Sequence, residues 1–180
     1  KGYVARDECL YESQDNVQIS ECYNKLDKYF FHVKHNRILA DIKQSVKIEE
    51  FDCLHAHSLF SNGYIAMKIK EKYGIPYIVA VRSTDLNVFF KYMVHLRGLG
   101  QRILKEADRI VFLSQPYRDI LIQNYVSRHY QKEILEKCAV VPNGIDSFWF
   151  KNIGTPKRIL DKACIKLIHV GALSKRKNVS

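Results

Sequence analysis

The sequence predicts an α/β protein built on a Rossmann-like, doubly wound parallel sheet. Short apolar runs typical of buried strands alternate with longer amphipathic segments typical of helices. The run 77–81 is apolar throughout, as expected for a parallel strand that is buried on both faces. Polar side chains follow the end of each run, where open α/β sheets bind their ligands. These three observations together favour a ligand-binding sheet of parallel strands.

The expected elements follow one another without an internal repeat or a low-complexity linker. Gly74 ends the first long helix, and Pro116 occupies the first turn of a later one, with Ser114 as its N-cap. Before residue 36 the pattern is weaker, with 17–19 as an edge strand and 29–31 packing over the sheet edge. In chain order we expect strand 52–56, helix 59–72, strand 77–81, helix 86–107, strand 109–113, a helix from Pro116, helix 128–136, strand 139–141 and strand 166–170.

The composition is that of a globular protein with an anionic partner. Of 180 residues, 47% are hydrophobic and 27% are charged, and no apolar run is long enough to span a membrane. The net charge of +10 favours phosphates, nucleotides, nucleic acid or an acidic lipid surface, and charge alone does not choose among them. No recognition motif or aromatic-basic platform supports nucleic acid, so we expect none as a partner. The chain lacks an initiating Met and ends where a helix should begin, so we expect a fragment.

The five cysteines are scattered and lack C-x-x-C spacing. Cys53, Cys138 and Cys164 lie in or beside apolar runs. We therefore expect buried free thiols in a reducing compartment, and neither a disulfide framework nor a zinc site.

Two histidines close the first expected strand. If His55 and His57 both lay in the strand, their side chains would point to one side and could hold a metal. No third ligand is visible, so we expect no metal. His57 in the following loop, facing a substrate, is the other interpretation.

Arg82 and Asp85 follow the second expected strand. In one interpretation they form a structural pair, in which Asp85 caps the next helix and Arg82 satisfies its charge. In the other, the Arg82 guanidinium faces the substrate, where it can hold developing negative charge or a sugar hydroxyl. The sequence leaves both open.

The segment 86–107 carries an apolar stripe with basic residues off it. The stripe fits a core helix, and a basic amphipathic helix can also lie on an anionic membrane. Gly98 and Gly100 weaken the helix and are candidate break points. The stripe consists of Phe89, Met93, Leu96 and Ile103, and the basic residues are Lys91, His95, Arg102 and Lys105.

Six segments in order resemble the retaining glycosyltransferases of family four, which have the GT-B fold. The resemblance covers roughly residues 51–178, and the pairing of the Pro-Asn-Gly-Ile-Asp turn with the later Gly-x-Leu-x-x-x-Lys-Asn loop is its most specific part. The segments are 52–57, 74–79, 82–85, 107–114, 141–146 and 170–178.

The resemblance implies two Rossmann-like domains that face each other across a cleft. Residues 1–146 would be the acceptor-side domain, and 147–180 the hinge and the beginning of the nucleotide-sugar-binding domain. It places residues near the reacting sugar, on the acceptor side, in the hinge and at the donor phosphates. In that order they are Arg82 and His57; Asp85 and Ser114; Asn143, Gly144 and Asp146; Gly171 and Lys177.

Two positions depart from the family pattern. Arg82 stands where the family often has His, and Ala172 stands where it usually has Arg. The implied function is still transfer of a hexose, with retention and without a metal cofactor, from a nucleotide-sugar to a polysaccharide or glycolipid acceptor. We expect a cytoplasmic protein, with peripheral contact to an anionic inner membrane as an open alternative, and a fragment that is inactive alone.

Other classes remain as alternatives to a transferase. A non-catalytic Rossmann-like module with a basic surface for anionic ligands is the main one. A dinucleotide oxidoreductase would need a Gly-x-Gly-x-x-Gly fingerprint, which the chain lacks.

Overall fold

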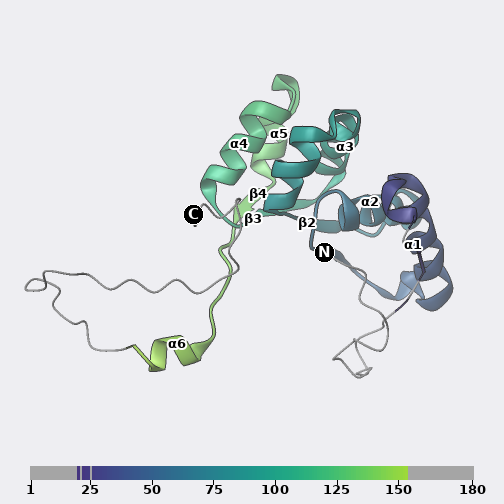
Figure 1. Ribbon diagram of the computed structural model, residues 1–180, viewed down its shortest axis with the longest axis horizontal. Coiled ribbons are helices and arrows are strands. Elements are labelled where there is room, and N and C mark those ends of the chain that lie inside the picture. Colours follow the sequence, from purple (N-terminus) through teal and green to yellow (C-terminus); the bar gives the residue numbers. More distant parts are fainter. Residues whose placement is uncertain (1–19, 21, 25, 154–180) are drawn as a thin grey trace, which may run out of the picture. The chain divides into compact units, whose positions relative to one another are not determined.

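The computed structural model describes residues 20, 22–24 and 26–153, with only the backbone of Lys28 (Figure 1). The chain divides into two compact units, Lys1–Asn143 and Gly144–Ser180. The expected strands 17–19 and 166–170 lie outside the described residues.

A four-stranded, wholly parallel sheet forms the centre of the first unit, which confirms the predicted fold class. The strands pair in the order β1-β2-β3-β4, and β2 has the predicted bounds. Among the described strands the order runs in one direction, so the reversal that defines double winding does not fall within them. The strands are β1 (Leu54–Ala56), β2 (Tyr77–Val81), β3 (Arg109–Phe112) and β4 (Cys138–Val140).

The helices of the first unit form a layer in which α1, α2, α3 and α5 pack one on the next. A sequential strand order with right-handed crossovers places the connecting helices on one face, and Figure 1 shows α3, α4 and α5 grouped beside β2, β3 and β4. Their bounds are η2 (Asp27–Tyr29), α1 (Phe31–Ser45), η3 (Ile48–Glu50), α2 (Ser61–Tyr73), the π-helix η4 (Asp85–Phe90), η5 (Val94–Leu96), α3 (Arg97–Glu106), α4 (Gln115–Tyr125) and α5 (Arg128–Glu136).

The core lies between this helical layer and the sheet. Tyr77, Phe60, Phe90 and Phe112 are its largest fully buried side chains. The Tyr77 hydroxyl donates a hydrogen bond to the Ile103 carbonyl at 2.6 Å, so this polar group is satisfied inside the core. Gly74 adopts φ 75° at the end of α2, as its predicted terminating role requires.

The prediction of one long helix over 86–107 is wrong. The π-helix η4 and a further turn run to Tyr92, Met93 leaves helical geometry with φ −95° and ψ 67°, and α3 starts only at Arg97. The Arg97 guanidinium donates to the carbonyls of Phe90 (2.7 Å) and Lys91 (3.3 Å), so it satisfies carbonyls that the break frees. Gly98 and Gly100 lie inside α3 and do not break it.

The apolar stripe of this segment belongs to the core, as one interpretation held. Leu96 and Ile103 are buried, while Phe89 and Met93 are half-buried and pack against the same core. The face that a membrane contact would have required is therefore covered by protein.

The prediction that residues 29–31 pack over the sheet edge is wrong. Tyr29 and Phe30 are 74% and 63% exposed. Phe31 instead begins α1, and its ring lies 5.6 Å from that of Tyr64 and 6.3 Å from that of Phe89. The cluster splits because Phe31 faces α2 from the first turn of α1, whereas Tyr29 and Phe30 precede that helix.

Cysteine burial is also corrected in part. Cys53 is exposed because it precedes β1, the edge strand of the described sheet. Cys138 and Cys22 are half-buried free thiols, and burial raises the pKa of Cys138 to about 11. Cys164 lies outside the described residues.

The described part of the second unit is a turn and a short helix. Helix α6 (Ser147–Lys151) begins after Asp146, whose Oδ1 accepts a hydrogen bond from the Phe148 N–H at 2.7 Å. Asp146 is therefore the N-cap of α6. Ile145, Phe148 and Trp149 are exposed.

Candidate functional site

The carboxyl ends of the four strands share one edge of the sheet because all four run parallel. His57 follows β1, Arg82 follows β2, Ser114 comes shortly after β3, and Asn143 follows β4. Four of the residues that the sequence singles out are thus brought to this edge. Gly144 and Asp146 belong to the second unit, and Gly171 and Lys177 lie outside the described residues.

Arg82 ties the first two loops of this edge together. Its Nε donates a hydrogen bond to the His57 carbonyl at 3.0 Å. One N–H donor of the guanidinium is thereby engaged, and the half-buried side chain is held between the ends of β1 and β2. The two candidate catalytic residues are therefore in direct contact.

Asp85 acts on a different helix from the one that the sequence suggested. It is 2% exposed, and its carboxylate accepts hydrogen bonds from the N–H groups of Arg82 (2.8 Å), Leu59 (3.1 Å) and Phe60 (3.2 Å). Asp85 therefore caps the turn that leads into α2, and the prediction that it caps its own helix is wrong. Burial raises the pKa of Asp85, against the opposing effect of these three donors.

Arg82 and Asp85 do pair, but not through the Arg82 side chain as the sequence suggested. Asp85 binds the Arg82 backbone N–H, while the Arg82 side chain turns to the His57 carbonyl. The backbone is the partner because Asp85, the first residue of η4, lies only three residues after Arg82 and within reach of that N–H. This arrangement frees the guanidinium from a buried carboxylate.

The rings of His55 and His57 lie against each other in a tilted arrangement. Their ring centroids are 4.2 Å apart with an interplanar angle of 38°, with His55 inside β1 and His57 in the loop beyond it, as one interpretation held. Partial burial lowers the pKa of His55, and the positive charges of His57 and Arg82 lower it further. The three side chains form a basic cluster in which Arg82 is the permanent cation, since the lowered pKa favours the neutral form of His55.

The described residues contain no group of three or more His, Cys, Asp or Glu side chains placed to hold a metal ion. None of the helices in the described part of the chain has the length and apolar character that crossing a bilayer requires.

Ser114 occupies the N-cap position of α4 but does not cap it through its side chain. Its backbone is extended, with φ −155° and ψ 154°, and the side chain makes no capping hydrogen bond. Pro116 lies in the first turn of α4, as predicted. The Ser114 hydroxyl therefore lies at the sheet edge and does not cap α4.

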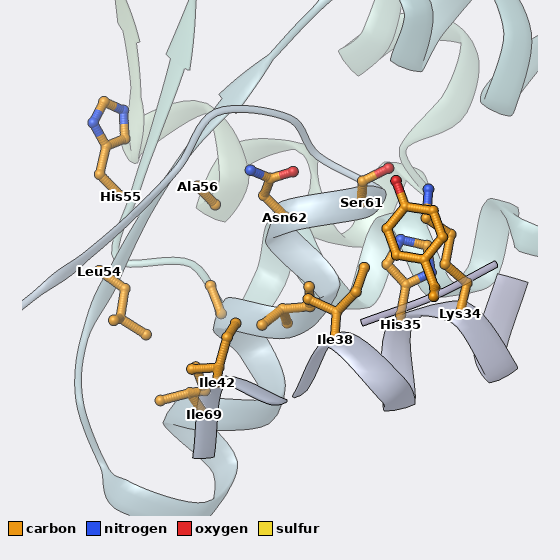
Figure 2. A pocket seen from close by; sticks show the side chains of 13 residues that line it. Lys34, His35, Ile38, Ile42, Leu54, His55, Ala56, Ser61, Asn62 and Ile69 are labelled. Carbon is orange, nitrogen blue, oxygen red and sulfur yellow. The ribbon is translucent and has the colours of Figure 1, made fainter. Parts of the chain in front are cut away.

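A pocket that sequence reasoning missed lies beside this edge. Figure 2 shows it between α1, α2 and β1, with a volume of about 430 Å³. His35 and Lys34 line it from α1, and Asn62 lines it from the start of α2. No local signal marks these residues, because a polar residue on an amphipathic helix gives no indication that it will face a cavity.

A parallel α/β sheet with basic and hydroxyl side chains along its carboxyl edge defines a Rossmann-like ligand-binding domain. The chain belongs to Glycosyltransferase Family 4, whose family description matches residues 11–147 of the 180. The match spans all four described strands and confirms the resemblance found in the sequence. A comparison with curated proteins gave no match.

Proposed function

We propose that this chain is the acceptor-side portion of a retaining hexosyltransferase, which transfers a hexose from a nucleotide-sugar to a polysaccharide or glycolipid acceptor. The observation that carries the proposal is the Arg82 guanidinium, held by the His57 carbonyl at the carboxyl edge of a family 4 sheet. A cation fixed there is suited to charge that develops during transfer.

Each residue has a distinct role in this proposal. When the nucleoside diphosphate leaves, negative charge grows on its phosphate and the sugar gains oxocarbenium character. Arg82 and His57 contact the reacting sugar and its leaving group, and Ser114 offers a hydroxyl to the acceptor. Asp85 is a positioning residue, because it fixes the loops that carry Arg82 and His57.

The donor phosphates would meet Gly171 and Lys177, with cations and helix N–H groups in place of a metal. A hinge at Asn143, Gly144 and Asp146 would let the donor domain close and exclude water. The donor and acceptor partners are thus a nucleotide-sugar and a glycan or glycolipid.

The test uses the full-length protein that contains this chain. Arg82→Ala should lower kcat/KM for hexose transfer by about a hundredfold or more, and Arg82→Lys should restore only part of the activity because Lys lacks the guanidinium fork. Arg128→Ala, at the exposed start of α5, is the matched control. Wild-type activity in Arg82→Ala would contradict the proposal, and NMR of the product anomer would decide between retention and inversion.

The basic cluster also favours a second candidate, a non-catalytic module with a basic surface for anionic ligands. His55, His57 and Arg82 together with a net charge of +10 support it. The 180-residue chain alone should give no turnover with a nucleotide-sugar under either proposal. Turnover by the full-length protein would favour the transferase, and tight anion binding without turnover would favour the module.

We further propose a cytoplasmic protein with peripheral contact to an anionic membrane. The net charge of +10 supports the membrane contact. Sedimentation with vesicles that contain anionic lipid, compared with neutral vesicles, tests the contact. Equal sedimentation with both would contradict it.

A further inference from the structure

Helix α1 is attached to the rest of the first unit through a buried histidine. His35 is 2% exposed, and it is the one buried residue of this helix of 15 residues. The apolar side chains through which α1 packs on the core, Phe31, Leu39 and Ile42, are only half-buried. A segment with few buried apolar side chains is among the first to open. The attachment of α1 therefore depends strongly on a titratable side chain.

The surroundings of the His35 ring suit its neutral form. The ring lies 4.1 Å from that of Phe31 and 5.9 Å from that of Tyr64 on α2. Its Nδ1 lies 2.6 Å from the Phe31 carbonyl, and a carbonyl only accepts, so Nδ1 carries the hydrogen. Nε2 is buried and has no hydrogen-bond partner. A second proton would therefore have to go to Nε2, where the new donor would find neither an acceptor nor water.

The charges around His35 also oppose a protonated ring. Burial lowers the pKa of His35 more than the hydrogen bond to Phe31 raises it, and Lys34 and His32 lower the pKa further. Among the described residues no carboxylate forms an ion pair with His35, and Asp27 of η2, which packs against α1, is already bound by Arg37 at 2.6 Å. The other titratable groups on this side are Tyr64 and Lys68 of α2 and His55 of β1.

We propose that His35 is an acid-sensitive switch, which holds α1 on α2 while its ring is neutral and releases α1 when Nε2 is protonated. The released helix would expose the ring to water, so the charged form would be solvated. Figure 2 shows His35 next to Lys34 on the α1 side of the pocket beside β1, so release of α1 would open that pocket. The proposal does not depend on the proposed hexosyltransferase function.

The direction of the pH effect follows from the lowered pKa. Because the folded pKa lies below the ordinary value of 6.5, the released form binds the proton more readily than the attached form. The attachment is therefore complete above pH 6.5 and weakens as the pH falls below it. One coupled proton weakens it by up to about tenfold for each pH unit, until the folded pKa is reached. Asp108 acts in a different range, since its contribution is lost only at a pH below 3.8.

Amide hydrogen exchange of the 180-residue chain, followed by NMR at about pH 7.5 and about pH 5.5, tests the switch. Protection is expressed relative to an unstructured chain at the same pH, which removes the intrinsic pH dependence of exchange. We expect the protection of α1 to fall by about tenfold at the lower pH, while that of α3 stays the same. Unchanged protection of α1, or an equal loss in α1 and α3, would overturn the proposal.

Three variants assign the response to His35. His35→Phe keeps an aromatic ring and His35→Leu keeps an apolar side chain, and neither titrates, so each should give α1 the same protection at both pH values. His32→Gln is the matched control, because it removes an exposed histidine from the same helix and should keep the wild-type response. Circular dichroism melts establish which variants fold. A wild-type response in either His35 variant, or loss of the response in His32→Gln, would refute the switch.

Discussion

Asp85 shows how one residue can organise the whole edge of a sheet. Its carboxylate joins the loops after β1 and β2, because it accepts from the N–H groups of Leu59 and Phe60 in one loop and of Arg82 in the other. The sequence marked Asp85 as a cap, because Asp after a strand is typical of one. It could not identify the capped segment, since Leu59 and Phe60 reach Asp85 only through the packing of α2 against β2.

Asp85→Ala tests this role. We expect it to lower the free energy of unfolding by at least about 3 kcal/mol, because each unpaired buried donor costs about 1–3 kcal/mol. Chemical denaturation followed by circular dichroism measures the change. Asp119→Ala removes a more exposed carboxylate, paired with Arg118, and should cost less than about 1 kcal/mol. Similar losses in the two variants would contradict the role given to Asp85.

The Asp108 carboxylate should stabilise the fold near neutral pH and lose this contribution in acid. Partial burial raises its pKa, but Lys70 Nζ at 2.7 Å and the Tyr77 N–H at 2.9 Å outweigh this and hold the pKa below the ordinary value of 3.8. Since the folded pKa is the lower one, the stabilisation is present above the unfolded pKa and is lost as the pH falls through the folded value.

Asp108→Asn should therefore be less stable than the wild type near neutral pH, and it should lose less stability than the wild type on acidification. Urea unfolding at a series of pH values measures both. Glu50→Gln, which removes one partner of the exposed pair with Lys47, is the control and should follow the wild-type profile. Parallel profiles for Asp108→Asn and the wild type would exclude this contribution.

At the scale of elements, α3 owes its close approach to the core to one glycine. A Cβ on Gly100 would lie 2.7 Å from Phe60 Cζ and 2.8 Å from Phe90 Cζ, whereas a Cβ on Gly98 would meet nothing within 4 Å. The sequence suggested that both residues weaken the helix. The structure separates them, since only Gly100 faces the aromatic core.

The two alanine variants should therefore change stability in opposite directions. Gly100→Ala should destabilise the protein by about 1–3 kcal/mol, because buried rings must shift. Gly98→Ala should stabilise it by up to about 1 kcal/mol, because alanine favours a helix. Thermal and urea unfolding of both variants provide the measurement, and destabilisation by Gly98→Ala to the same extent would refute the packing argument.

Elements whose bounds are set by nearby residues in the sequence were predicted well, whereas features that depend on tertiary contacts were not. The bounds of β2 and α5 follow from the sequence, because an apolar run after Pro76 and an amphipathic segment ending near Lys137 carry their own signals. The break at Met93 carries none, since the apolar stripe continues through it. Arg97 binds the freed carbonyls from beyond the break, and the Phe90 ring is held by the core. The pocket depends on packing between α1 and α2 and was equally hidden.

Within the part of the chain that the structure describes, the buried core belongs to the first unit. Every residue of the two core clusters found in the described part of the chain precedes Asn143. The second unit contributes none of them, and its described aromatic residues are exposed. The first unit should therefore fold as a domain on its own. A chain that ends at Asn143 should melt within a few degrees of the 180-residue chain, and loss of a cooperative transition would contradict this.

Trp149 provides an independent probe, because it is the one tryptophan of the chain and is 65% exposed in the second unit. Its emission should already be that of a solvated indole before heating, and it should change little while circular dichroism reports the melting of the first unit. Two probes that coincide would indicate one cooperative transition. A red shift of Trp149 emission that tracks the circular dichroism melt would therefore show that Trp149 is buried with the first unit and would exclude its independence. Tyr77→Phe removes the hydrogen bond to the Ile103 carbonyl and should lower the free energy of unfolding by about 1 kcal/mol. It should therefore shift the circular dichroism transition and leave Trp149 emission unchanged.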